Sequence, residues 1–143
     1  MTHDSGAGAV AAVHDYVAAF NTRDADGMAD AFNFPHVRLA KGVFTHIESR
    51  DLFVARQAHV SELLLEEGWA KTVAQSIGVV HVGADKVHLD IEYTRHHADG
   101  ALYSRFRTLW IATLLDGHWG VQFRSSFLTS DASTLGPAAS PPE

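Results

Sequence analysis

The first apolar residues of the chain recur at helical spacing. Val10, Val13, Val17 and Phe20 fall on one stripe with Tyr16 beside it, at the i, i+3, i+4, i+7 separation of a buried helical face. The pattern predicts a helix that stops near residues 21–23.

A second, short helix is predicted after Asp24, because aspartate is a favoured N-cap residue. Met28, Ala31 and Phe32 would form its inner edge, and Pro35 would terminate it. Two helices therefore open the chain.

Two short extended segments follow, at residues 36–41 and 43–47, with Gly42 as the hinge. Residues 50–66 predict a third helix, which Gly68 ends. Its predicted inner side is a line of residues at helical spacing, joined by three apolar neighbours: Leu52, Ala55, His59 and Leu63, with Phe53, Val60 and Leu64.

After Trp69 the chain reads as long strands joined by tight turns, and two Asp-Gly pairs mark hairpins. With Asp99-Gly100 as a loop, Glu92 pairs with Arg107 on one face, and the other face pairs Tyr93 with Phe106, Ile91 with Thr108, and Leu89 with Trp110. Asp116-Gly117 as a loop pairs Leu114 with Trp119, Ala112 with Val121, Trp110 with Phe123, Thr108 with Ser125, and Phe106 with Phe127.

The two turns agree on which face of these strands is apolar. The predicted inner face holds Val87, Leu89, Ile91, Tyr93, Phe106, Trp110, Val121, Phe123 and Phe127, interrupted by Thr108 and Ser125. The predicted outer face is polar and includes Arg105, Arg107 and Arg124, whose partners would be Glu92 and Asp90. Leu109, Ile111 and Leu115 form an apolar row on that outer face, and we therefore expect a homodimer built on it.

This order of elements predicts one α+β domain at residues 8–129. Three helices would cover one face of a strongly curved antiparallel sheet in a cone-shaped fold, leaving an apolar pocket between the layers. Residues 1–7 and 130–143 are small, polar or proline-rich and are expected to be flexible tails.

Composition narrows the classes of partner. The net charge of −6 disfavours nucleic acid, and no apolar stretch approaches the roughly 20 residues needed to span a bilayer. The chain has no cysteine, which removes disulfides and thiolate metal sites and suits a reducing cytoplasm. The ten histidines lack HxH or HxxxH spacing, so we expect no metal and no other cofactor.

The stretch YVAAFNTRDADGMADAF, from Tyr16, resembles the two-helix opening of the nuclear-transport-factor-2-like superfamily, and LWIATLLDGHWGVQFRSSF is similar to its final hairpin. The superfamily includes ketosteroid isomerases, polyketide cyclases, scytalone dehydratase and limonene epoxide hydrolase. The resemblance covers about residues 10–127 and implies the cone-shaped fold. It implies a reaction far less well, because one scaffold hosts many functions.

Few functional residues transfer with the resemblance. Tyr16 matches the helix-1 tyrosine with which ketosteroid isomerases donate a hydrogen bond to an oxyanion. Their general-base aspartate has no counterpart in FPHVRLAKG, and Trp110 falls where their protonated carboxylic acid lies. Steroid isomerase activity is therefore not expected, since a lone phenol cannot move a proton between carbons.

Other polar residues remain candidates beside a structural interpretation. Tyr16 is either a core tyrosine or a hydrogen-bond donor, and His59 is either a structural histidine or a general base. His36 and Arg38 share one strand face; pointing inward, they could shuttle a proton and hold a carboxylate or enolate, whereas pointing outward they would be solvated. Thr108 and Ser125 form a hydroxyl pair that is self-satisfied or anchors a ligand. The remaining predicted pocket walls are Phe20, Tyr93, Trp110, Phe123 and Phe127.

Three functions fit these residues. The first is a cofactor-independent acid-base enzyme, such as an isomerase, dehydratase or cyclase, that acts on a small, mostly apolar carbonyl or hydroxyl compound. The second is a binding module with the same pocket and no chemistry. The third is a structural dimer whose cavity has no role. The position of an imidazole relative to Tyr16 would separate them.

Overall fold

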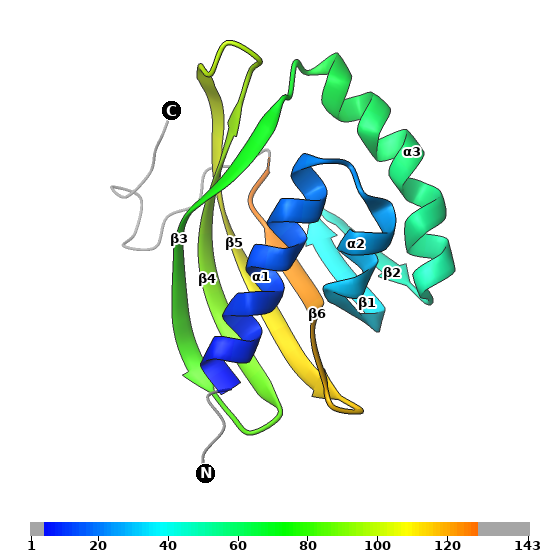
Figure 1. Cartoon of the computed structure of the whole chain (residues 1–143), viewed down its shortest axis with the longest axis vertical. Helices are drawn as coiled ribbons and strands as arrows, with labels where there is room; N and C mark the ends of the chain where they lie inside the picture. The colour runs from blue at the N-terminus through cyan, green and yellow to red at the C-terminus, as the bar shows by residue number, and fades with distance from the viewer. Residues whose placement is uncertain (1–4, 129–143) are drawn as a thin grey trace.

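The computed structural model describes residues 5–128. Helices and strands follow in the order α1 (Ser5–Asn21), α2 (Ala25–Asp30), β1 (Phe32–Ala40), β2 (Val43–Ile47), α3 (Arg50–Glu66), β3 (Lys71–Val82), β4 (Lys86–His96), β5 (Leu102–Leu115) and β6 (His118–Ser126). The helices lie on one side of a strongly curved sheet (Figure 1). The predicted α+β class and element order are confirmed.

The six strands form one sheet in the order β2-β1-β6-β5-β4-β3. All neighbouring strands pair antiparallel except β1 and β6, which pair parallel. The sheet is therefore mixed rather than wholly antiparallel as predicted. The parallel pairing is possible because β2, α3 and three strands separate β1 from β6 along the chain.

The first predicted hairpin register is confirmed by the β4–β5 pairing, which joins Tyr93 to Phe106, Ile91 to Thr108 and Leu89 to Trp110. At the tip the pairing shifts so that His96 joins Leu102, and the loop spans residues 97–101 rather than Asp99-Gly100 alone. The second turn is confirmed as well: Asp116 and Gly117 both have positive φ, and Ala112 pairs with Val121.

From Ile111 toward the N-terminal end of β5, the second register departs from the prediction because β6 has a β-bulge at Gln122. Ile111 pairs with Phe123, Trp110 with Arg124, and Thr108 with Ser126. One extra residue in β6 reverses the faces of all positions that follow it. Arg124 and Ser126 therefore take the inner face that was predicted for Phe123 and Ser125.

Helix α1 packs against β3 to β6 and buries a face of small and aromatic residues: Ala9, Ala12, Val13, Tyr16, Ala19 and Phe20. It begins at Ser5, which is itself buried. Residues 5–7 are therefore helical, contrary to the predicted tail through residue 7. The other predicted tail, 130–143, and the domain end at residue 129 lie outside the described residues.

The predicted Asp24 cap is confirmed, since its Oδ1 accepts a hydrogen bond of 3.0 Å from the backbone nitrogen of Gly27. Helix α2 ends at Asp30, and β1 begins at Phe32, so Pro35 lies inside β1 rather than after a helix.

Helix α3 has the predicted bounds but a different inner face. Phe53, Gln57 and Leu64 are buried, whereas Leu52 and Leu63 are about half exposed. The predicted line of Leu52, Ala55, His59 and Leu63 therefore does not face the sheet.

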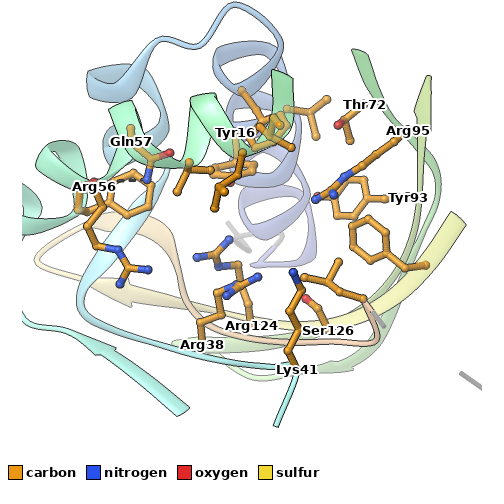
Figure 2. A pocket seen from close by; sticks show the side chains of 18 of the residues that line it. Tyr16, Arg38, Lys41, Arg56, Gln57, Thr72, Tyr93, Arg95, Arg124 and Ser126 are labelled. Carbon is orange, nitrogen blue, oxygen red and sulfur yellow. Dashed lines mark hydrogen bonds between the residues drawn. The ribbon is translucent and has the colours of Figure 1, made fainter. Parts of the chain in front are cut away.

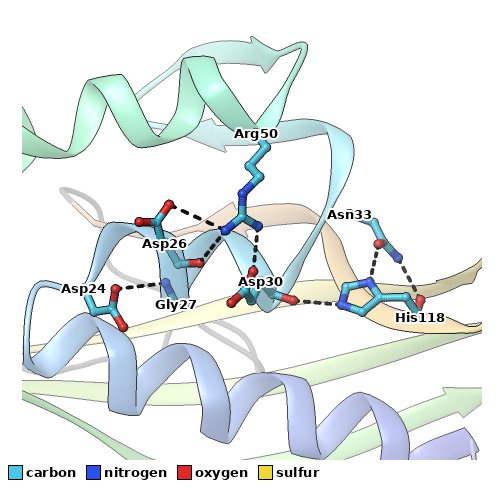
Figure 3. A network of polar contacts seen from close by, with 7 residues as sticks. All are labelled: Asp24, Asp26, Gly27, Asp30, Asn33, Arg50 and His118. Carbon is cyan, nitrogen blue, oxygen red and sulfur yellow. Dashed lines mark hydrogen bonds and ion pairs between the residues drawn. The ribbon is translucent and has the colours of Figure 1, made fainter.

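A polar network joins α2, the start of α3, β1 and β6 (Figure 3). Arg50 pairs with Asp30 at 2.6 Å and with Asp26 at 3.5 Å. His118 lies 2.7 Å from Oδ1 of Asn33 through Nδ1 and 2.8 Å from the backbone oxygen of Asp30 through Nε2. These contacts fix α2 and the beginning of α3 to one edge of the cone.

Candidate functional site

A cavity of about 430 Å³ opens between the helices and the concave face of the sheet. Its walls come from α1, α3, every strand, and the segments that follow β1, α3 and β6. Val17, Phe20, Val60, Leu64 and Phe106 supply apolar surface. The size lies within the range typical of small-molecule sites.

Five cationic side chains line this cavity: Arg38, Lys41, Arg56, Arg95 and Arg124. They are five of only eleven Lys and Arg residues in a chain whose net charge is −6. Figure 2 shows the guanidinium groups of Arg38 and Arg124 rising from the sheet, Arg56 entering from α3, and Lys41 at the near edge. A cationic cavity therefore lies inside an acidic protein.

Only one carboxylate, that of Glu67, lies among the described residues of the cavity wall. Its Oε2 accepts a hydrogen bond of 3.0 Å from Arg95 and another from the hydroxyl of Tyr103. Within residues 5–128, no ion pair involves Arg38, Lys41, Arg56 or Arg124. Four cations of the cavity thus have no carboxylate partner in the described part of the chain.

Arg38 and Arg124 are neighbours across the parallel β1–β6 pairing, so their side chains leave the sheet on the same face. Burial, followed by the positive charges of Arg124, Arg56 and Arg95, lowers the pKa of Arg38 to about 10. Burial also lowers the pKa of Arg124. Both groups remain cationic at neutral pH, but keeping these charges partly buried has an electrostatic cost in free energy.

His36 lies behind the cavity wall and is fully buried. Its Nδ1 is 3.0 Å from the backbone oxygen of Val121, and its Nε2 accepts a hydrogen bond of 2.9 Å from Nε of Arg124. Burial, followed by the charge of Arg124, lowers the pKa of His36 to about 2. The imidazole is therefore neutral and both its nitrogens are engaged.

Tyr16 stands in the wall within an aromatic cluster. Its ring stacks on Phe32 at 5.0 Å and meets Trp110 edge to face at 5.3 Å. Tyr93 also belongs to this cluster, and its hydroxyl and Nε1 of Trp110 are buried without a hydrogen-bond partner among the described residues. The aromatic wall thus holds polar atoms that the fold itself leaves unpaired.

Five residues predicted for the pocket do line it: Tyr16, Phe20, Arg38, Tyr93 and Trp110. His59 reaches only the rim, because its side chain is 73% exposed and lies 3.7 Å from Glu62. No imidazole faces both the cavity and Tyr16 within residues 5–128: His36 lies behind the wall and His59 lies at the rim.

The structure contradicts the predicted pocket positions of Phe123, Ser125 and Phe127. The Gln122 bulge places Phe123 opposite Ile111 and Ser125 opposite Leu109, on the outer face, and Phe127 is 46% exposed. Thr108 is buried beneath the wall rather than in it. Its hydroxyl donates to the backbone oxygen of Ser125 at 2.9 Å and pairs with the hydroxyl of Ser126 at 2.7 Å.

Sequence reasoning missed several polar residues of the site: Lys41, Arg56, Gln57, Glu67, Thr72, Arg95, Arg124 and Ser126. Arg124 was assigned to the outer face together with Arg105 and Arg107. The pairs Arg105–Glu92 and Arg107–Asp90 do form there, at 3.4 and 2.9 Å. Three arginines on β5 and β6 were thus assigned to two acidic partners, Glu92 and Asp90. This surplus of arginines was the signal that one of them lies elsewhere.

Within residues 5–128, no three histidine or carboxylate side chains are grouped so that they could hold a metal ion. The described helices include none that is long and apolar enough to cross a membrane. The chemistry that this arrangement supports is the binding of negative charge beside an apolar surface.

Comparison with known sequences identifies one family. The family described as NTF2-like protein (DUF6841) matches residues 7–123, which is most of the chain. No curated protein matches.

Solved structures share the fold at low sequence identity. A domain of unknown function with a cystatin-like fold from Nostoc punctiforme has a TM-score of 0.74 and 14% identity, covering 94% of this chain and 82% of that one. An NTF2-like protein with a cystatin-like fold from Novosphingobium aromaticivorans has a TM-score of 0.73 and 15% identity, covering 94% and 88%. A ketosteroid isomerase-like protein from Erwinia carotovora atroseptica has a TM-score of 0.67 and 18% identity, covering 90% and 99%.

Proposed function

Because the chain belongs to the NTF2-like protein (DUF6841) family and four cations of its cavity have no carboxylate partner among residues 5–128, we propose that it binds a small amphipathic organic anion. The observation that carries this proposal is the group of Arg38, Lys41, Arg56 and Arg124 around one cavity. A structural cavity alone gives no reason to gather like charges there.

Electrostatics favours an anionic ligand. Two opposite unit charges 4 Å apart attract by about 4 kcal/mol at an effective dielectric constant of about 20. Arg38 and Arg124 are half-buried neighbours that repel each other in the empty cavity. An anion between them would replace this repulsion with charge-assisted hydrogen bonds.

The apolar part of the wall favours a ligand with a hydrocarbon or aromatic body. Val17 and Phe20 face the cavity from α1, and Val60 and Leu64 face it from α3. Trp110 closes the wall on the sheet side. A ligand with a charged head at Arg38 and an apolar body between the helices would match both surfaces.

The same geometry supports binding more than acid-base catalysis. A general base must reach the substrate with a free lone pair. His36 uses both ring nitrogens within the protein. Oε2 of Glu67 accepts from both Arg95 and Tyr103, so this carboxylate serves as an ion-pair partner in the wall. Tyr16 could donate a hydrogen bond to the ligand, but it has no neighbouring base among the described cavity residues.

Isothermal titration with a matched pair of probes tests the proposal. We expect 4-phenylbutyrate to bind about 10-fold or more tightly than the neutral amide 4-phenylbutanamide at low ionic strength, since a charge-assisted hydrogen bond contributes about 1.5–3 kcal/mol. The variant Arg124→Gln should lose this preference. Arg105→Gln, on the outer face beside Glu92, should keep it. Equal binding of the acid and the amide, or loss of the preference in Arg105→Gln, would contradict the proposal.

A further inference from the structure

The number of unpaired cations in the cavity exceeds what a singly charged ligand can neutralise. Arg95 is paired with Glu67, which leaves Arg38, Lys41, Arg56 and Arg124 without an ion-pair partner among residues 5–128. Arg38 and Arg124 are half-buried whereas Lys41 and Arg56 are exposed, so a bound monoanion would leave one half-buried positive charge uncompensated, which is unfavourable. The charge balance therefore indicates a ligand head with more than one negative charge.

The arrangement of the guanidinium groups adds a second constraint. Arg38 and Arg124 approach from adjacent strands, while Arg56 approaches from α3 on the opposite wall (Figure 2). The charges of Arg124 and Arg56 both act on Arg38, so the three groups share one electrostatic environment. A planar carboxylate has two oxygens to offer, whereas a phosphate monoester has three terminal oxygens in a tetrahedral array.

The orientation of Arg124 fits such a head group. Its Nε is used by His36 at the back of the wall. The side chain faces the cavity and also hydrogen-bonds Tyr16, but a guanidinium has five N–H donors and keeps others for a ligand. Arg38 forms no hydrogen bond through its side chain within residues 5–128. Both therefore keep donors for an oxyanion.

We propose that the ligand of this cavity is a small organic phosphate monoester, or an anion of the same charge and shape, whose head lies among Arg38, Arg56 and Arg124 and whose apolar body lies against Phe20 and Val60. This inference rests on the proposed function and specifies its ligand. The body distinguishes the ligand from free inorganic phosphate, which would leave the apolar wall uncovered.

Phenyl phosphate and phenyl sulfate provide a matched test, because they share shape and body but differ by one charge at pH 7.5. By isothermal titration we expect phenyl phosphate to bind about 10-fold or more tightly than phenyl sulfate, and more tightly than inorganic phosphate. At pH 5.0 the phosphate ester becomes a monoanion, since its second pKa is about 6, and the preference should fall toward unity. His36 stays neutral at pH 5.0 because its pKa is about 2.

Two variants separate the head-group contacts from general charge effects. Arg56→Gln should reduce the preference for phenyl phosphate over phenyl sulfate at least about threefold, because it removes the third guanidinium. Arg50→Gln removes a cation that is paired with Asp26 and Asp30 outside the cavity and should leave the preference unchanged.

Equal affinity for the two esters, or no response to Arg56→Gln, would overturn the inference while leaving anion binding intact. Binding of 4-phenylbutyrate without binding of either ester would also overturn it. If inorganic phosphate bound as tightly as phenyl phosphate, the apolar body would contribute nothing to affinity, and the proposal of an organic ester would be wrong. If none of these anions binds, the proposed function fails as well.

Discussion

Nε of Arg124 donates a hydrogen bond of 2.9 Å to Nε2 of the fully buried His36. The imidazole therefore carries its proton on Nδ1, which donates to the backbone oxygen of Val121. A neutral histidine thus fixes the orientation of a cationic side chain at the cavity. His36 acts here as a positioning residue, and its own protonation would oppose the fold.

The buried His36 should make stability fall in mild acid. Its pKa is lowered to about 2 in the folded protein, against about 6.5 when unfolded, so below pH 6.5 only the unfolded state takes up this proton. The contribution of neutral His36 to the free energy of unfolding is complete above pH 6.5. Below that pH it is lost by about 1.4 kcal/mol per pH unit. His36→Gln keeps an acceptor for Arg124 and removes the titration. Urea unfolding at pH 7 and pH 5 should show the wild type losing about 2 kcal/mol more than this variant; equal losses would contradict the interpretation.

The hydroxyl pair of Thr108 and Ser126 tests the observed register. In a double-mutant cycle of Thr108→Val with Ser126→Ala, we expect a coupling energy of about 1 kcal/mol, because the two hydroxyls lie 2.7 Å apart. The matched cycle with Ser125→Ala should show coupling near zero, since the side chain of Ser125 faces the other way. Stronger coupling to Ser125 would restore the register without a bulge.

Removal of a cavity cation should stabilise the empty protein. The charge of Arg38 is disfavoured in the folded state by burial and by three neighbouring arginines, so Arg38→Met should raise the free energy of unfolding by about 1 kcal/mol after solvent screening is allowed for. Chemical denaturation without ligand measures this change. Lys71→Met, at an exposed site on β3, should change stability by less than about 0.5 kcal/mol. A destabilised Arg38→Met would mean that packing of the side chain outweighs its charge.

Steroid isomerisation should be undetectable. Turnover of a 3-oxo-Δ5-steroid, followed by the absorbance of the conjugated product, requires a general base worth about 10² to 10⁴ in rate. β1 presents no carboxylate, and Trp110 occupies the wall beside Tyr16. Rapid turnover would show that another residue supplies the base.

The outer sheet face should mediate homodimerisation. Leu109 and Leu115 are 40% and 41% exposed there, and the bulge adds Phe123 beside Ile111. Arg107 borders this patch with its partner Asp90. An apolar centre with a charged border is typical of a self-complementary interface.

Sedimentation velocity at micromolar concentration tests this expectation. The wild type should sediment as a dimer and Ile111→Asp as a monomer. Leu52→Asp, at an exposed site on α3, should remain dimeric because it lies away from the sheet. A monomeric wild type, or a dimeric Ile111→Asp, would exclude this face as the interface.

Local signals in the sequence were sufficient for the elements and for two turns. Asp99-Gly100 and Asp116-Gly117 lie at hairpin tips, where Gly100, Asp116 and Gly117 adopt the positive φ that Gly and Asp tolerate. The face of α3 could not be read in the same way. Apolar residues of α3 occur on several sides of the helix, so Leu52 and Phe53 were equally plausible inner positions. Only the packing of the helix on the sheet distinguishes them.

The candidate site was less predictable, because its cations come from segments far apart in the chain. Arg38, Arg56 and Arg124 lie on β1, α3 and β6, and only the tertiary fold brings them together. The alternation of β6 suggested that Arg124 faces outward. A polar residue such as Gln122 fits either side of a strand, so the bulge has no signature in the pattern.

The bulge at Gln122 determines which face of the sheet Arg124 occupies, and therefore whether this arginine reaches the cavity. If Gln122 instead took a regular place in the ladder, Phe123 would stand opposite Trp110, Arg124 would join Leu109 on the outer face, and the cavity would lose one of its cations. A relative one residue shorter between Asp116 and Arg124 would pair regularly along β6 and still present the arginine opposite Trp110. When homologues are aligned, a one-residue gap in β6 is therefore expected to preserve the inward arginine, whereas a homologue of equal length keeps it inward only where the bulge is retained.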